Sequence, residues 1–260
     1  MYQINQHISN LNLQLEERYR GNCPVCNGRN TFTVTRTLTG ILYNCYKAGC
    51  NLGGTSPTTV TVADILNKSK TKVLKTFSLP SYVIRGRDEV ILWANKYNLD
   101  HSAITLYYDV RENRIVFPVF YDNNIVDATG RALRKEHNPK WKRYGTSSYA
   151  YTVGTGTIAV LVEDCISAAV ITTEEPNCTG VALMGTALLP DHVAQLNSFS
   201  AVIVALDPDA AKKTLQFTSE LKGLLSHKNI FALKLEDDLK YAKERDIIRV
   251  KEIIRRMQWN

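Results

Sequence analysis

The sequence has no long apolar run, no leader-like N-terminus and no internal repeat or low-complexity tract. A membrane-spanning helix needs about 18 or more consecutive apolar residues, and no segment approaches that length. Residues 1–5 lack the basic-then-apolar pattern of a secretory signal peptide. We therefore expect a protein that works inside a cell and has no membrane partner.

The composition is otherwise that of an ordinary globular protein. The 260 residues are 44% hydrophobic and 22% charged, which is enough for one large domain or two modest ones with a real core. The formal net charge is +7. A basic balance favours a polyanionic partner such as nucleic acid, although many basic proteins bind none.

Cysteine is sparse and unevenly placed. Of the six cysteines, four fall within residues 23–50, which in an intracellular chain favours a metal site over disulfides. Four thiolates in tetrahedral geometry form a closed structural zinc site, and a hairpin over 31–44 would bring the two cysteine pairs together. Disulfides and a redox Cys-x-x-Cys motif are the alternatives. The predicted Zn²⁺ ligands are Cys23, Cys26, Cys45 and Cys50.

The first 75 residues indicate a small domain followed by a linker. Apolar residues at near-helical spacing predict a short helix within 1–20. The cysteine cluster completes a predicted domain over 1–54. Small, polar, glycine and proline residues from 51 to 59 are typical of a turn and linker, so we place a linker over 55–75.

Residues 157–257 alternate regularly between apolar β-branched runs and helical patterns. Four strand-then-helix units predict parallel strands joined by crossover helices, and therefore an α/β fold. The final helix, expected over about 240–257, has an apolar stripe that favours packing on the core; docking on a separate protein is the alternative. The expected strands cover 157–162, 180–184, 201–206 and 229–234.

Carboxylates follow three of these four strands. Ligands of open α/β sheets bind beyond the carboxyl ends of the strands, and Mg²⁺ prefers carboxylate oxygens. Asp207-Pro208-Asp209 alone also suits a turn, and Glu163 suits a metal ligand, a general base or a helix N-terminal acid. The repetition at successive strand ends favours a divalent-metal site able to perform phosphoryl chemistry. Glu236-Asp237-Asp238 follows the last strand.

The middle of the chain, 76–150, combines strands with a basic segment. Residues 114–121 predict a strand in which Pro118 requires an edge position or a bulge. From 131 to 143 there are six Lys or Arg residues against one acid, with aromatic residues interleaved. These cations favour contact with nucleotides or nucleic acid rather than a solvated charged loop. The residues chosen for this role are Arg131, Arg134, Lys140 and Lys142.

Three motifs carry a resemblance to a known family. Residues 162–168 (VEDCISA), 184–188 (MGTAL) and 206–211 (LDPDAA) resemble TOPRIM domains, and more narrowly DnaG-type primases and the primase halves of phage primase-helicases. The cysteine quartet resembles the zinc-binding domain of phage primases, and 130–144 resembles the basic subdomain of the primase RNA polymerase core. The resemblance covers roughly residues 21–257.

This resemblance implies a fold and a set of roles. The fold is an α/β TOPRIM-type parallel sheet with flanking helices in an α+β RNA polymerase core, preceded by a small zinc ribbon. The basic subdomain would cover 76–150 and the TOPRIM subdomain 151–260. Glu163 matches the catalytic glutamate and also stands among the expected Mg²⁺ ligands. The other expected ligands are Asp207, Asp209 and either Asp238 or Asp237.

Two positions depart from the family pattern. Ser167 stands where the family usually has an aspartate, and Lys212-Lys213 replaces a common Gly-Arg pair. The first departure bears on the coordination of Mg²⁺, for which Asp164 is a poor substitute because a helix-start residue points differently. Neither departure removes the metal-binding pair.

The expected function is that of a DNA primase. Such an enzyme makes short RNA primers on single-stranded DNA from nucleoside triphosphates with Mg²⁺, or alternatively Mn²⁺. We expect a phage protein in the cytoplasm or nucleoid of a bacterial host, with a separate helicase as a further partner because no helicase segment follows. A TOPRIM nuclease and a non-enzymatic RecR-like recombination mediator are the rivals; a topoisomerase would need a far larger chain.

Overall fold

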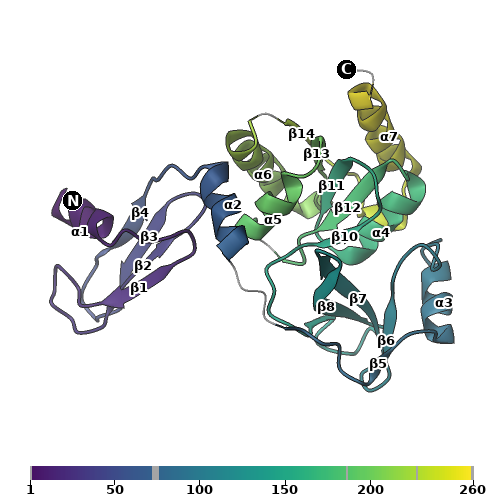
Figure 1. Cartoon of the computed structure of the whole chain (residues 1–260), viewed down its shortest axis with the longest axis horizontal. Helices are drawn as coiled ribbons and strands as arrows, with labels where there is room; N and C mark the ends of the chain where they lie inside the picture. Colours follow the sequence, from purple (N-terminus) through teal and green to yellow (C-terminus); the bar gives the residue numbers. More distant parts are fainter. Residues whose placement is uncertain (1, 72–75, 186, 227, 259–260) are drawn as a thin grey trace. The chain divides into compact units, whose positions relative to one another are not determined.

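The structure is a computed structural model that describes residues 2–71, 76–185, 187–226 and 228–258 (Figure 1). The chain divides into two compact units, an N-terminal unit of Met1–Lys72 and a C-terminal unit of Val73–Asn260. Residues 72–75 of the predicted linker and Thr186 of the predicted 184–188 motif lie outside the described residues. Each unit has its own sheet structure and is described by itself.

In the N-terminal unit, helix α1 (Tyr2–Asn10) precedes a four-stranded antiparallel sheet. The leading helix predicted within 1–20 is confirmed. Ile8, Phe32 and Val34 are buried in a small core that also includes cysteine side chains. The strands, in sheet order, are β1 (Arg18–Gly21), β2 (Phe32–Arg36), β3 (Ile41–Cys45) and β4 (Gly53–Ser56).

The segment interpreted as a linker contains regular structure. Strand β4 lies within the predicted turn, and helix α2 (Val62–Thr71) lies within 55–75. Thr61 and Asp64 begin this helix reciprocally: the Asp64 carboxylate accepts from the Thr61 backbone N–H at 2.8 Å, and the Thr61 hydroxyl accepts from the Asp64 N–H at 3.2 Å. Such a capping box stabilises a helix start. The compositional interpretation overlooked this pair.

The C-terminal unit begins with a five-stranded antiparallel sheet beside helix α3 (Asp88–Asn95). Pro118 lies in β7, an inner strand, and the register shifts between Val119 and Phe120. The bulge expected from the proline is therefore adjacent to it, and the alternative of an edge strand is wrong. The strands, in sheet order, are β5 (Val83–Ile84), β6 (Tyr107–Asp109), β7 (Arg114–Tyr121), β8 (Asn124–Ala132) and β9 (Trp141–Arg143).

The second sheet of this unit contains the four predicted parallel strands. A short strand that the sequence did not suggest, β10 (Tyr151–Val153), adds to its edge in antiparallel orientation. The order is β10-β12-β11-β13-β14, so β11 and β13 are adjacent. The parallel strands are β11 (Ile158–Val162), β12 (Cys178–Ala182), β13 (Ala201–Val204) and β14 (Asn229–Ala232).

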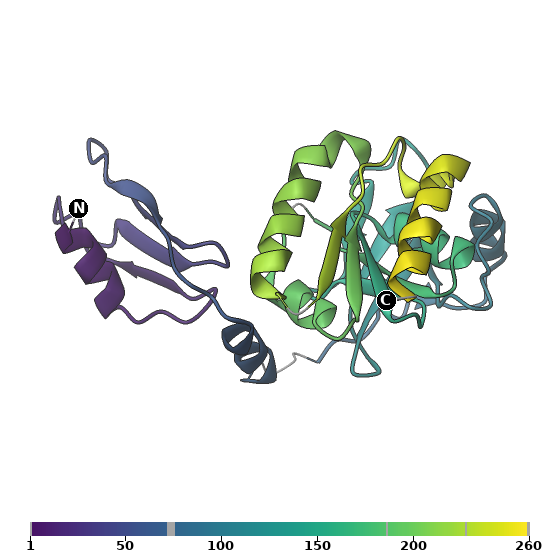
Figure 2. The same cartoon turned by 90° about the horizontal axis from the view of Figure 1, so that it is seen from above.

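Helices cover both faces of this second sheet. Figure 2 shows α6 (Ala211–Leu224) on one face and α7 (Glu244–Gln258) on the other. The apolar stripe of α7 is buried in the main core, which confirms the packing predicted for the last helix. The remaining helical segments are α4 (Cys165–Glu174), α5 (Pro190–Leu196), η1 (Pro208–Ala210) and η2 (Leu239–Tyr241).

The parallel strands β11, β12 and β13 are buried on both faces, whereas the edge strand β14 is exposed at three of its four residues. Helix α4 packs unusually close to β12, because a Cβ atom at Gly180 would lie 2.2 Å from the backbone oxygen of Ala168. The predicted fold class is confirmed: a parallel sheet with flanking helices follows a small unit that holds the cysteine quartet. No helix among the described residues is long and apolar enough to cross a membrane.

Candidate active site and zinc centre

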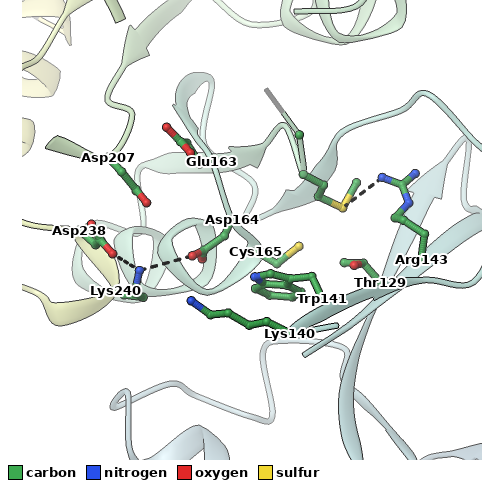
Figure 3. Close-up of a pocket in the computed structure, with 12 residues that line it drawn as sticks. Thr129, Lys140, Trp141, Arg143, Glu163, Asp164, Cys165, Asp207, Asp238 and Lys240 are labelled. Carbon is green, nitrogen blue, oxygen red and sulfur yellow. Dashed lines mark hydrogen bonds and ion pairs between the residues drawn. The ribbon is translucent and has the colours of Figure 1, made fainter. Parts of the chain in front are cut away.

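The C-terminal unit contains a pocket of about 450 Å³ between its two sheets. One side comes from the carboxyl ends of the parallel strands, and the other comes from β8, β9 and the residue before β9 (Figure 3). Acids and bases therefore face each other across it. The lining residues are Thr129, Lys140, Trp141, Arg143, Glu163, Asp164, Cys165, Met184, Gly185, Asp207, Asp238 and Lys240.

The structure brings three of the predicted acids to this pocket. Glu163 follows β11, Asp207 follows β13, and Asp238 precedes η2 after β14. Burial, followed by the charges of Asp238 and Glu163, raises the pKa of Asp207 to about 7, although Lys240 opposes this rise. Burial and the neighbouring charge of Asp209 also raise the pKa of Glu163. The carboxylates at the strand ends therefore have too few nearby positive charges to offset their mutual repulsion.

The other two predicted acids are not among the residues that line this pocket. Asp209 is exposed in η1, near enough to Glu163 to affect its pKa. Asp237 forms an ion pair with Lys243, whose Nζ lies 3.0 Å from Asp237 Oδ2. Of the two candidates for the third acid, the structure therefore places Asp238 at the pocket and pairs Asp237 elsewhere.

A lysine that the sequence analysis did not select lies among these acids. Lys240 pairs with Asp238, and its Nζ lies 3.6 Å from Asp164 Oδ2. Burial lowers the pKa of Lys240, but the two carboxylates outweigh this effect and leave it raised. The available signal was its position, two residues beyond an acid at a strand end.

Asp164 is held in place by the helix it begins. Its Oδ1 accepts hydrogen bonds from the backbone N–H groups of Ile166 and Ser167, each at 2.9 Å, and so caps α4. Ser167 is buried, and its hydroxyl has no hydrogen-bond partner among the described residues. It does not appear in the described pocket lining, so it does not supply the ligand that its family position implied.

The basic segment contributes to the pocket through alternate residues of one strand. Trp141 and Arg143 line the pocket, whereas Lys142 between them pairs with Glu112. Successive side chains of a strand point to opposite faces, so this division follows from β9 being extended. Among the predicted cations, Lys140 lines the pocket.

Two further predicted cations lie outside the described lining. Arg134 is exposed. Arg131 stacks over Trp141, with its guanidinium carbon 5.3 Å from the ring centroid. Burial lowers the pKa of Arg131 despite the opposing effect of Asp164. Arg131 therefore supports a pocket residue.

Arg143 is fixed by a fully buried carboxylate. Its Nη2 donates to Asp127 Oδ2 at 2.5 Å and to the Ser147 backbone oxygen at 2.7 Å. Asp127 also accepts from the backbone N–H of Gly145 at 2.7 Å. An acid inside the largely apolar strand β8 was the signal for this positioning role, and the sequence analysis did not use it.

The carboxylates at the pocket suit a single Mg²⁺ that is held partly by water and substrate, and not an ion held by protein ligands alone. No group of three carboxylate, imidazole or thiol ligands within 4.8 Å occurs at the pocket among the described residues. Mg²⁺ commonly takes one or two carboxylates and completes its octahedron with water and substrate phosphates. Asp207, with Glu163 close enough for its charge to raise the pKa of Asp207, offers that number of carboxylates.

The raised pKa of Asp207 predicts that Asp207→Asn increases the free energy of unfolding at high pH but not at low pH. Its pKa is about 7 in the fold against roughly 3.9 in an unfolded chain, so the native state keeps a proton that the unfolded state loses. Wild-type stability therefore falls as pH rises from about 4 to about 7. Without divalent ions, Asp207→Asn should be more stable by about 1–3 kcal/mol at pH 8 and not at pH 4, measured by urea unfolding. The exposed Asp122→Asn change is the control; equal behaviour of the two variants would contradict the expectation.

The four cysteines of the N-terminal unit form a cluster suited to zinc. Their sulfur atoms all lie within 4.8 Å of one another, with 4.0 Å between Cys23 and Cys50 and 3.7 Å between Cys26 and Cys45. Sulfurs about 2.3 Å from a tetrahedral Zn²⁺ lie about 3.8 Å apart, so the spacing fits. These four residues would hold Zn²⁺ as a structural ion.

The electrostatics of the quartet favour a bound cation. A hydrogen bond with the Thr31 hydroxyl, 3.3 Å from the sulfur, lowers the pKa of Cys45 to about 6. A backbone hydrogen bond from Leu52 lowers the pKa of Cys50, but burial and the adjacent thiols outweigh it and raise the pKa to about 12. Four thiolates this close are stable together only around a metal ion.

Comparison with known proteins identifies structural similarity without close sequence relatives. No family model matches the sequence, and no curated protein matches it significantly. Among solved structures, the zinc-binding and RNA polymerase domains of the Aquifex aeolicus primase align over 96% of this chain and 82% of that chain, with 17% identity and a TM-score of 0.45. The similar structures are DNA primases.

Two other primase structures extend this result. The primase fragment of the bacteriophage T7 primase-helicase protein aligns over 89% of this chain and 98% of its own, with 15% identity and a TM-score of 0.40. A DnaG primase catalytic domain bound to single-stranded DNA aligns over 62% and 71%, with 15% identity and a TM-score of 0.44. The resemblance to primases stated from sequence motifs is confirmed as structural similarity.

Proposed function

We propose that this protein is a DNA primase, which makes short RNA primers on single-stranded DNA by joining nucleoside triphosphates. The observation that carries the proposal is the pocket itself: Glu163, Asp207 and Asp238 on one side face Lys140, Trp141 and Arg143 on the other. Nucleotidyl transfer needs both halves, because carboxylates alone repel triphosphates and cations alone hold no metal. A phage origin and a separate helicase remain part of this proposal.

The pocket residues would have different roles in the reaction according to their positions. Asp207 and Asp209 would hold Mg²⁺, or Mn²⁺ in its place, and the ion would neutralise the phosphates of the incoming nucleotide. The raised pKa of Glu163, caused first by burial and then by Asp209, suits a base that accepts the proton of an attacking 3′-hydroxyl. Lys140 and Arg143 would bind phosphates, and Trp141 offers an aromatic surface for a base.

The N-terminal unit would contribute template recognition. Phe32 is fully buried and Tyr43 packs against the same core, so these aromatics stabilise the small unit. Tyr46 is exposed beside the zinc ligand Cys45, where its ring is available to stack on an unpaired base. We propose that this unit selects the template site at which a primer begins.

The test is primer synthesis on a library of single-stranded templates. The full chain, loaded with zinc, is incubated with Mg²⁺, ribonucleoside triphosphates and the library, and the products are resolved by length. Oligoribonucleotides that depend on template sequence would support the proposal. Their absence across the library, or cleavage of DNA with Mg²⁺ alone, would favour the nuclease instead; DNA binding without either reaction would favour the RecR-like mediator.

The alternation along β9 predicts which cations serve the substrate. Arg143→Gln should raise the KM for ribonucleoside triphosphates by about 10- to 100-fold, the equivalent of one charge-assisted hydrogen bond. Lys142→Gln is the matched control, because Lys142 pairs with Glu112 and lies outside the described lining. It should change KM by less than about threefold. Steady-state synthesis with folded variants measures both, and equal effects would refute the assignment.

A further inference from the structure

Lys240 is the most enclosed cation at the acidic end of the pocket. Only 9% of its side chain is exposed, against 52% for Lys243 in the same loop. Figure 3 shows its ammonium group between Asp238 and Asp164, with both interactions drawn. Its position is therefore defined by two carboxylates of the pocket and not by solvent.

We propose that Lys240 is a built-in cation that occupies the Asp238 side of the pocket, so that the pocket binds one divalent ion, at Asp207. This inference rests on the metal-dependent chemistry proposed above and specifies how many ions that chemistry uses. In a two-ion site, an ion on each side neutralises the attacking and leaving oxygens. Here a lysine stands where the second ion would need its ligands.

The geometry of the acids supports this assignment. Asp164 is committed twice, because one oxygen caps α4 and the other faces Lys240. Asp238 is engaged by the same ammonium group. A second divalent ion between these two acids would have to displace a buried positive charge. Such a displacement leaves a cation without its partners in a partly desolvated site, which is strongly unfavourable.

The Asp207 half of the acidic end has no equivalent enclosed cation among the described residues. Asp207 lines the pocket without an ion pair to any described residue, and Lys213 near Glu163 supplies only a longer-range charge. The acidic end therefore has one neutralised half and one half that still attracts a cation. The expected stoichiometry is one divalent ion per chain in addition to zinc.

Substitution of Lys240 should convert a one-ion site into a two-ion site. We would titrate Mn²⁺ into the full, zinc-loaded chain without DNA or nucleotides and follow free Mn²⁺ by electron paramagnetic resonance. Wild type should bind one Mn²⁺. Lys240→Gln frees two carboxylates and removes a nearby positive charge, so it should bind a second ion and bind the first on the order of tenfold more tightly.

Three further variants make the result specific. Lys240→Arg keeps the charge and should retain one ion. Lys243→Gln makes the same chemical change at a lysine that pairs with Asp237 outside the described lining, and should behave like wild type. Asp207→Asn combined with Lys240→Gln should lose one of the two ions. Circular dichroism confirms that each variant is folded.

Two results would overturn the inference: two Mn²⁺ ions on the wild-type chain, or identical Mn²⁺ binding by Lys240→Gln and Lys243→Gln. Both are independent of primer synthesis, because no template or nucleotide is present. Failure of the priming test with the expected Mn²⁺ counts would therefore reject the proposed function and leave the role of Lys240 standing. Successful priming with unchanged Mn²⁺ counts would do the reverse.

Discussion

Removal of zinc should unfold the N-terminal unit and leave the C-terminal unit folded. The N-terminal unit has a small core in which the cysteine side chains themselves participate. Units of this size commonly need a metal, and structural zinc contributes about 10–16 kcal/mol of apparent binding free energy at neutral pH. Hydrogen exchange on the full chain should show loss of protection in β1–β4 after treatment with a strong zinc chelator.

A single cysteine substitution should reproduce this effect. Cys45→Ser removes one of four ligands and should abolish stoichiometric zinc binding together with protection of β1–β4. Cys165→Ala is the matched control, because Cys165 is a buried free cysteine of the C-terminal unit. It should keep zinc and full protection of the sheet. Retained protection of β1–β4 in the chelated protein or in Cys45→Ser would show that the unit folds without metal.

Loss of the Asp207 charge should abolish primer synthesis. Asp207→Asn removes the pocket carboxylate that we propose as a metal ligand, and should reduce the rate of dinucleotide formation by about 10³-fold or more, comparable to losing about 4 kcal/mol of transition-state stabilisation. Because the same substitution should stabilise the metal-free fold at pH 8, an inactive and more stable protein is expected. That combination separates a catalytic role from misfolding.

Asp237→Asn provides the matched comparison for this activity. Asp237 follows the same sheet but pairs with Lys243 outside the described lining. Its substitution should leave the rate of dinucleotide formation within about threefold of wild type. Single-turnover synthesis at saturating nucleotide distinguishes the two. A large loss of activity in Asp237→Asn with little loss in Asp207→Asn would show that Asp237, and not Asp207, binds the metal.

Much of the fold was predictable because the parallel strands have a simple sequence pattern. Strands buried on both faces are continuous and apolar, as β11 and β13 are. Strand β10 has only three residues and forms by pairing with β12, so no local sequence pattern predicts it. Helix α2 was overlooked because the small and polar residues before it indicated a linker, and its capping pair, Thr61 and Asp64, was not used as a signal.

The candidate site was predictable to the level of strand ends but not of individual contacts. Residues after successive parallel strands must converge, which accounts for Glu163, Asp207 and Asp238 at one pocket. Which of two adjacent acids faces the pocket depends on loop geometry that a sequence does not specify. The roles of Lys142 and Arg143 were within reach, because alternation along a strand separates neighbours.

The arrangement of the two sheets has an evolutionary consequence. Strand β9 is an edge strand that pairs with β8, and it carries Trp141 and Arg143 of the pocket, whereas the acids that line the pocket follow strands of the other sheet. Substitutions in β9 therefore leave the parallel sheet and its carboxylates undisturbed. Such a separation allows preference for different nucleotides or templates to diverge among related chains while the reaction chemistry is conserved.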